Sequence, residues 1–308
     1  MIVQATDEAV CRAATLLRQG GLVSFPTETV YGLGANALDT EAVKRIYGVK
    51  QRPFASPLIV HVSDIDMARS VTAEWPPLAQ KLAKRFWPGP LTIVLKKAAI
   101  VPELVTAGLD SVGVRVPANA VALALIRKSG VPIAAPSANR FSELSPTTAE
   151  HVRTGLGDRI EMILDDGPAT VGIESTVVSL RRDHPTILRP GMISLSELEA
   201  FTHVRWEREF DLPTVEGEAA ESPGRHPHHY APRTPFYVLE PGAAKPVGRG
   251  RVLTLPTNRE AYAASLYSEL HKADAEDLDW IAVEKPPETP EWAGILDRLR
   301  RASVRKDS

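Results

Sequence analysis

Polar and charged side chains that could bind a charged ligand are concentrated between Leu22 and Val62. The loop Pro26-Thr-Glu-Thr-Val-Tyr31 carries two threonine hydroxyls, a carboxylate and a phenol, and it follows a predicted apolar strand. Lys50, Arg52 and His61 follow in the same stretch. Polar groups placed between buried strands are costly unless they have partners. The cluster therefore predicts a ligand site that includes Thr27, Thr29, Tyr31 and His61.

Lys50 and Arg52 are two residues apart, after a predicted helix and before Pro53. In an extended chain, side chains two apart point the same way, so both cations could reach one anion. Lysine supplies a point charge, and arginine supplies a fork that matches phosphate oxygens. A solvated basic surface patch is the alternative, and for this pair taken alone it is the more common meaning of the pattern.

Arg115 lies within the apolar strand Val112-Gly-Val-Arg-Val-Pro117, where a charge needs a partner. A ligand carboxylate and a structural ion pair explain it equally well. Arg189 follows Ile187-Leu188 and precedes Pro190-Gly191, which is a similar strand end with the same two explanations. Both arginines are therefore candidate ligand contacts.

Hydroxyl and amide side chains flank other predicted strands. Ser137 and Asn139 follow the strand at 132–135, Ser145 comes soon after, and Ser175 precedes a further strand. Such groups at the carboxyl end of a strand suit nucleotide contacts, because open α/β sheets bind ligands at that edge. Turns use the same residue types to bond their own backbone. Taken alone, the turn is the better explanation, as a packed core histidine is for His61.

Several familiar signatures are absent from the sequence. It has no Gly-x-x-x-x-Gly-Lys-Ser/Thr phosphate loop, so a nucleotide would have to be bound in another way. Gly32-Leu-Gly34 lacks the third glycine and the strand-then-helix context of a dinucleotide site. Cys11 belongs to an amphipathic helix rather than to an electropositive niche. No metal site is predicted, because histidine clusters in linkers are mostly incidental, and this applies to His226, His228 and His229.

Composition narrows the class of protein. The chain has 308 residues, of which 44% are hydrophobic and 24% charged, as in an ordinary globular protein. A net charge of −2 gives no overall attraction to nucleic acid or to anionic membranes. One cysteine excludes an internal disulfide and a cysteine-rich zinc site. Because no apolar run reaches 18 residues and no signal segment begins the chain, we expect a cytoplasmic protein without a membrane span.

Helical and strand patterns intermix without strict alternation as far as residue 204. Thr6 is expected to cap a helix that ends at Gly20-Gly21. Further helices are expected at Thr40–Tyr47, after Pro76-Pro77, and at Ala120–Lys128, Ala149–Thr154 and Leu195–Phe201. Strands are expected at Leu22–Phe25, Leu58–Val62, Leu91–Leu95, Val112–Val116, Pro132–Ala135, Ile160–Leu164, Ser175–Leu180 and Thr186–Leu188. The pattern predicts an α/β fold with a mixed, twisted sheet and flanking helices.

The rest of the chain divides into two parts. Residues 205–235 are rich in acidic residues, prolines and histidines and read as a long linker. Residues 236–308 carry three strand patterns and two helix patterns, which predict a small C-terminal α/β domain. We expect it to be marginally stable alone, because a domain of this size buries a small core.

Taken in order, these stretches resemble the YrdC-like threonylcarbamoyl-AMP synthases, in their longer two-domain form. The matching stretches are Pro26-Thr-Glu-Thr-Val-Tyr-Gly-Leu-Gly34, Lys50-Gln-Arg-Pro53, Pro57-Leu-Ile-Val-His61, Val112-Gly-Val-Arg-Val-Pro117, Pro136-Ser-Ala-Asn139, Ser145-Pro146, Glu174-Ser-Thr-Val-Val178 and Leu188-Arg-Pro-Gly191. Ser222-Pro-Gly224, His229-Tyr-Ala-Pro232 and the tail Asp297-Arg-Leu-Arg-Arg301 are similar to the long form. Ser56 departs from the family, which usually has Asn or His there, so no ligand contact is carried over to it.

The resemblance implies a reaction in which L-threonine, bicarbonate or CO2, and ATP give threonylcarbamoyl-AMP and pyrophosphate. Mg²⁺ is expected to arrive with ATP, with little help from protein carboxylates. The product would pass to the proteins that transfer the threonylcarbamoyl group to tRNA; direct tRNA binding is compatible with this role but is not required.

The resemblance also implies roles for the candidate residues. Threonine would be bound by Thr27, Thr29, Tyr31, His61, Arg115 and Ser175. ATP would be bound by Lys50, Arg52, Ser137, Asn139, Ser145, Arg189 and Tyr230, and the first four of these would also be catalytic. Cations are needed because both reactants are anions once the amine of threonine has captured CO2. The C-terminal domain is expected to support or gate the site.

Two other functions remain open from the sequence. YrdC-like domains also serve in carbamoyl-transfer and carbamoyl-phosphate-hydrolysing enzymes, but those chains carry further domains or zinc-binding cysteines. A non-catalytic RNA-binding module would need a wide basic surface with exposed aromatics. A pI near 6.5 and an aromatic content of 6% do not favour that module.

Overall fold

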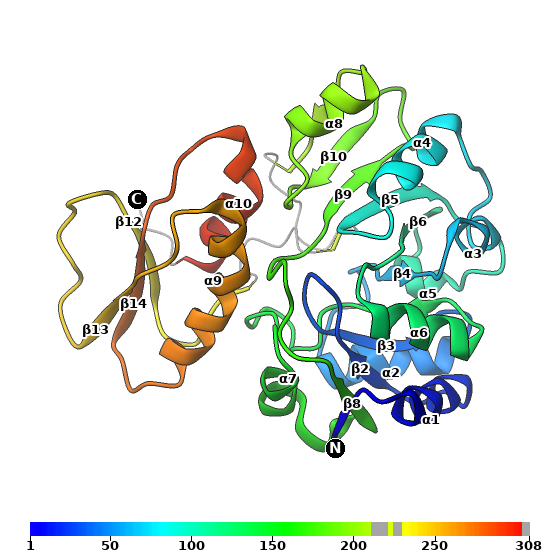
Figure 1. The fold of residues 1–308 in the computed structure, drawn as a ribbon, viewed down its shortest axis with the longest axis horizontal. Coiled ribbons are helices and arrows are strands. Elements are labelled where there is room, and N and C mark those ends of the chain that lie inside the picture. The colour runs from blue at the N-terminus through cyan, green and yellow to red at the C-terminus, as the bar shows by residue number, and fades with distance from the viewer. Residues whose placement is uncertain (211–220, 224–229, 304–308) are drawn as a thin grey trace.

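The computed structural model describes residues 1–210, 221–223 and 230–303 (Figure 1). Within these residues the strands form one sheet of 11 strands and one of 3. The large sheet has the order β1-β8-β2-β3-β7-β4-β6-β5-β9-β10-β11. Its strands are β1 Ile2–Gln4, β2 Val23–Phe25, β3 Gly32–Asn36, β4 Ile59–His61, β5 Leu91–Lys96, β6 Ser111–Arg115, β7 Ile133–Ala134, β8 Met162–Asp165, β9 Thr176–Ser179, β10 Thr186–Arg189 and β11 Glu207–Arg208. Parallel and antiparallel pairs both occur, which confirms the predicted mixed sheet.

Helices cover both faces of this sheet. They are α1 Asp7–Arg18, α2 Thr40–Lys50, α3 Ile65–Ser70, α4 Pro77–Phe86, α5 Glu103–Thr106, α6 Ala120–Ser129, α7 Ala149–Leu156 and α8 Leu195–Thr202. Helices α1 and α6 pack on Phe25 in one apolar cluster, and α2 and α4 pack with Leu33 in another. Because Leu33 pairs with Ser24, next to Phe25, the two clusters lie on opposite faces.

The expected helix boundaries have identifiable causes. The Thr6 hydroxyl accepts a hydrogen bond from the backbone N–H of Ala9 and begins α1, as predicted. Helix α6 ends at Gly130, which adopts the left-handed conformation with φ of 68°. Within the described ranges, the chain has no helix with the length and apolar character needed to cross a membrane.

Two strands of the large sheet escape the sequence pattern. The sequence pattern predicts a helix from Thr6 and no strand before it, but the chain begins with β1 at the edge of the large sheet. Gly32-Leu-Gly34 lies inside β3. A Cβ atom on Gly34 would come within 2.8 Å of Ile133 and Phe25, so this strand needs glycine for close packing. Glycine is depleted in ordinary strands, and this hides β3 from a pattern search.

The C-terminal part forms the predicted small α/β domain, which packs against the large sheet's domain (Figure 1). Parallel strands lie in the order β12-β14-β13. Its elements are β12 Phe236–Leu239, β13 Gly250–Leu253, α9 Arg259–Asp274, β14 Trp280–Glu284 and α10 Ala293–Ala302, with a 3-10 turn at Pro290–Trp292. Its apolar cluster takes in Val30, Leu144 and Ile173 of the large domain. The two domains therefore share a core.

The segment predicted as a linker has ordered structure at its start. Strand β11 pairs with β10 and so extends the edge of the large sheet. Farther along, the described residue Tyr230 is 1% exposed and belongs to the shared core. The histidines at 226, 228 and 229 lie outside the described residues.

Candidate active site

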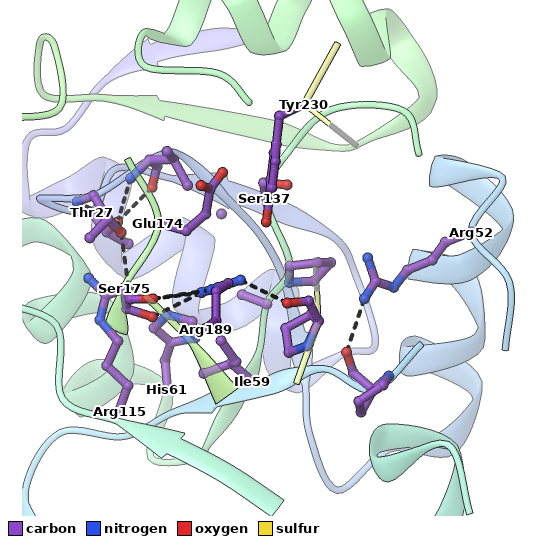
Figure 2. Close-up of a pocket in the computed structure, with 17 residues that line it drawn as sticks. Thr27, Arg52, Ile59, His61, Arg115, Ser137, Glu174, Ser175, Arg189 and Tyr230 are labelled. Carbon is purple, nitrogen blue, oxygen red and sulfur yellow. Dashed lines mark hydrogen bonds between the residues drawn. The ribbon is translucent and has the colours of Figure 1, made fainter. Parts of the chain in front are cut away.

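One cavity gathers most of the residues that the sequence singled out (Figure 2). The strands of the large sheet bring them there. His61 ends β4, Arg115 ends β6, and these two residues pair directly in the parallel ladder. The predicted site residues that line the cavity are Thr27, Thr29, Arg52, His61, Arg115, Ser137, Ser175, Arg189 and Tyr230. Figure 2 shows His61 and Arg115 toward one end of the cavity, Arg52 toward the other, and Arg189 between them.

One hydroxyl organises the loop between β2 and β3. Thr27 Oγ1 donates to the carbonyl oxygen of Val30 at 2.6 Å and accepts from the N–H groups of Thr29 and Val30, each at 3.2 Å. The next link comes from β6, where Arg115 Nη1 donates to Thr29 Oγ1 at 2.9 Å. The loop therefore presents its threonine hydroxyls to the cavity in a fixed arrangement.

Arg115 has the structural ion pair that the sequence left open. Its Nη2 lies 2.8 Å from Glu28 Oε1, and both side chains are buried. Its Nε donates to the carbonyl oxygen of Gly89 at 3.2 Å. Arg115 still lines the cavity, so a ligand carboxylate remains a predicted contact, but the charge that it brings is matched by Glu28.

Arg52 and Arg189 bring charge without a carboxylate partner among the described residues. Arg52 Nη2 donates to the carbonyl oxygen of Pro57 at 3.0 Å. Arg189 donates from Nε and Nη2 to the carbonyl oxygen of Ser175 and from Nη1 to that of Pro223. Burial lowers the pKa of Arg52 to about 10, and burial with nearby Arg298 also lowers the pKa of Arg189. Two buried guanidinium groups of this kind favour an anionic ligand.

Lys50 does not extend beside Arg52 as the sequence suggested. It is the last residue of α2, and Gln51 is left-handed with φ of 53°, so the assumption of an extended chain was wrong. The buried Lys50 ammonium instead donates to the carbonyl oxygens of Ser137 and Asn139. Burial and the charge of Arg52 hold the pKa of Lys50 well below its usual value. Lys50 therefore acts on the turn after β7, and it is not among the residues that line the cavity.

Three other predicted site residues bond protein groups rather than facing the cavity. Tyr31 donates from its hydroxyl to the carbonyl oxygen of Gly167 at 2.6 Å. Asn139 Nδ2 donates to the carbonyl oxygens of Arg140 and Glu143, each at 2.8 Å. Ser145 is held by Glu174, as described below. Their roles toward a ligand stay predictions, and any contact would require these side chains to turn or the ligand to reach them.

His61 is neutral at physiological pH. Burial and the nearby Arg115 charge lower its pKa to about 3. Its ring meets Phe25 edge-on, with the ring centres 5.9 Å apart. A neutral imidazole at the cavity wall can offer one donor and one acceptor to a polar ligand.

Sequence reasoning missed the carboxylate in the wall and the arginine that holds it. Glu174 lines the cavity, and Arg298 of α10 donates from Nε to Glu174 Oε2 at 2.6 Å. Both residues stood in matched stretches, Glu174 beside Ser175 and Arg298 in the C-terminal tail. Nothing in the sequence signals that residues 124 positions apart would meet.

Comparisons with known proteins assign the family. A model described as "Telomere recombination" matches residues 15–191, and one described as "Threonylcarbamoyl-AMP synthase, C-terminal domain" matches residues 193–304. A threonylcarbamoyl-AMP synthase from Bacillus subtilis (strain 168) is 42% identical over 334 aligned residues, with 98% of this chain and 94% of that protein covered. The chain belongs to the threonylcarbamoyl-AMP synthase family.

Two further comparisons with the threonylcarbamoyl-AMP synthase family, one of sequence and one of structure, also cover nearly the whole chain. The protein of that name from Pyrococcus abyssi (strain GE5 / Orsay) is 41% identical, with 94% of this chain and 93% of that protein covered. A crystal structure of P. abyssi Sua5 complexed with L-threonine matches with a TM-score of 0.91 and 38% identity. This match covers 98% of this chain and 97% of that one, so both domains and their arrangement are shared.

Proposed function

We propose that this chain makes L-threonylcarbamoyl-AMP and pyrophosphate from L-threonine, bicarbonate or CO2, and ATP. One observation carries the proposal: the chain matches, over nearly its whole length, a structure that holds L-threonine. The cavity supports the proposal, because it contains two buried guanidinium groups without carboxylate partners among the described residues. A zwitterionic amino acid and a triphosphate together need such a combination of hydroxyls and cations.

The cavity has two ends, and we assign a substrate to each. Threonine would lie at the end with His61 and Arg115, where Thr29 and Ser175 offer hydroxyls, Thr27 holds the loop that carries Thr29, and Arg115 meets the carboxylate (Figure 2). The phosphates of ATP would lie toward Arg52 and Arg189, near the Ser137 turn that Lys50 holds. Tyr230 would lie over the nucleotide.

In the proposed reaction the amine of threonine adds to CO2 and loses a proton, which gives a carbamate. A carbamate oxygen then attacks the α-phosphorus of ATP, the bond to the β-phosphate oxygen breaks, and pyrophosphate leaves. Arg52 and Arg189 would bring the two anions together and stabilise the charge in the transition state. No side-chain nucleophile is required.

Mg²⁺ would enter with ATP as part of the substrate. Among the described residues that line the cavity, Glu174 is the one carboxylate, and Arg298, Tyr267 and Ser145 already hold it. The adenylate would pass to the proteins that transfer its threonylcarbamoyl group to tRNA, and this agrees with a cytoplasmic location.

The test is substrate omission. The purified protein is incubated with Mg²⁺-ATP, bicarbonate and L-threonine, and pyrophosphate is measured with each component left out in turn. Release that needs all three supports the proposal. Release that ignores threonine would contradict the proposal and would instead indicate hydrolysis of ATP to AMP and pyrophosphate.

A further inference from the structure

A side chain of the C-terminal domain reaches into the wall of the cavity. Arg298, on α10, is 0% exposed. Its Nε donates to Glu174 Oε2 at 2.6 Å, its Nη2 to the carbonyl oxygen of Glu174 at 3.2 Å, and its Nη1 to that of Pro190 at 3.0 Å. Glu174 lines the cavity, and Pro190 directly follows Arg189. One guanidinium group thus spans both segments that carry the anion-binding wall.

Glu174 is fully occupied by partners outside the cavity. Its Oε1 accepts from Ser145 Oγ at 2.5 Å, and its Oε2 also accepts from the Tyr267 hydroxyl at 3.2 Å. Burial alone would raise the pKa of Glu174, but the charges of Arg298 and Arg189 outweigh it and lower that pKa. Glu174 is therefore a buried anion whose hydrogen-bonded cation comes from the other domain.

Arg189 lines the same cavity as Glu174, and its charge also lowers the pKa of Glu174 (Figure 2). While Arg298 holds the carboxylate, Arg189 donates to carbonyl oxygens and to Ser175 Oγ, and its charge stays available for a ligand. A buried carboxylate that loses its cation must find another or be protonated. Without Arg298, we expect Glu174 to draw Arg189 away from the ligand.

Arg298 also supports the aromatic residue over the cavity. Its guanidinium carbon lies 5.2 Å from the centre of the Tyr230 ring, which is within the range of a cation–π contact. Tyr230 lines the cavity, and its ring centre lies 6.1 Å from that of Tyr267. The same arginine therefore contacts two residues of the cavity wall.

We propose that Arg298 is a positioning residue through which the C-terminal domain sets the ATP end of the cavity: it holds Glu174 so that Arg189 remains free for phosphate. Arg298 does not touch the reactants, and its effect passes through Glu174. This inference rests on the proposed function, which assigns Arg189 to ATP.

The test compares Arg298→Gln with Arg300→Gln. Arg300 lies on the same helix, is exposed, and bonds Asp297 and Phe210 rather than the cavity wall. For Arg298→Gln, calorimetry should give ATP binding weaker by about tenfold, the size expected when one charge-assisted contact is lost, with L-threonine binding changed less than about threefold. Arg300→Gln should match the parent chain in both.

A rescue variant separates positioning from stability. In Arg298→Gln/Glu174→Gln the wall holds no carboxylate that could draw Arg189 away, so most of the lost ATP affinity should return. Arg298→Gln should lower the melting temperature under either role, because a buried carboxylate loses its cation. A purely structural role for Arg298 would leave the double variant as weak in ATP binding as the single one, and this result would overturn the inference. Equal weakening of both ligands would also overturn it. If the parent chain fails to bind ATP, the proposed function itself is wrong.

Discussion

At the scale of single residues, the cavity contains cations in two different states. Arg115 is matched by Glu28, whereas Arg52 and Arg189 donate to carbonyl oxygens. An arginine that is already paired with a carboxylate can orient a ligand carboxylate but attracts it only weakly. An arginine that is bonded to carbonyl oxygens alone attracts phosphate more strongly. This difference in pairing supports threonine at one end and ATP at the other.

Lys50 provides the first prediction at this scale. Lys50→Met should weaken ATP binding by about tenfold, because the carbonyl oxygens of Ser137 and Asn139 lose their hydrogen-bond donor and the turn after β7 loosens. L-Threonine binding should be unchanged. Lys44→Met, an exposed position on the same helix, is the control. Calorimetry with both ligands decides, and a loss of threonine binding with ATP binding intact would contradict our placement of the two substrates.

Residue types and order were enough to name most of the cavity wall, including Thr27, His61 and Ser175. Residue types and order could not show which side chains contact each other. Glu28 and Arg115 are both visible in the sequence, but their contact depends on the loop after β2 reaching the end of β6. Arg298 was hidden for the same reason, since its partner lies in the other domain.

At the scale of elements, the site depends on backbones that approach very closely. Helix α10 begins near Gly294, whose Cβ position lies 2.5 Å from the carbonyl oxygen of Gly191, just after β10. Strand patterns predicted β10 and a helix pattern predicted α10, but neither indicates that they pack together. Glycine at position 294 permits the close contact with Gly191 that brings Arg298 to Glu174.

Gly294→Ala tests this contact. The added methyl group should push α10 away from Gly191 and lower the free energy of unfolding by about 1–3 kcal/mol, the usual cost of overpacking. Gly155→Ala, in α7 with open space around its Cβ position, should instead be neutral or stabilising by up to about 1 kcal/mol. Urea unfolding measures both. Equal effects at the two positions would mean that the close packing of α10 is not limiting.

At the scale of the whole molecule, two domains share a core and a histidine stack. His151 of α7 and His271 of α9 stack with ring centres 3.9 Å apart, and His271 Nε2 lies 3.1 Å from the carbonyl oxygen of Ser145. Burial lowers the pKa of His151 to about 4 and also lowers that of His271. The strand and helix patterns predict the C-terminal domain as a separate unit, but they do not show that it shares a core and a histidine stack with the large domain.

Three histidines with lowered pKa values, His61, His151 and His271, predict that the folded protein is less stable in acid. A histidine with a lowered pKa stays neutral in the folded state, while the unfolded chain takes up a proton below about 6.5, so stability falls as pH drops below that value. For His61 the loss between pH 7 and pH 5 should be about 2 kcal/mol. Urea unfolding at both pH values measures it. His151→Phe keeps an aromatic ring without a titrating group, and it should reduce the pH dependence; an unchanged dependence would exclude this histidine as a source.

The central claim is that one cavity joins a carbamate of threonine to the α-phosphate of ATP. The most direct measurement supplies carbon-13 bicarbonate with L-threonine and Mg²⁺-ATP and follows the products by mass spectrometry. The account predicts threonylcarbamoyl-AMP that carries one carbon-13 atom, formed in equal amount with pyrophosphate. Pyrophosphate without the labelled adenylate, or an adenylate without the label, would contradict it.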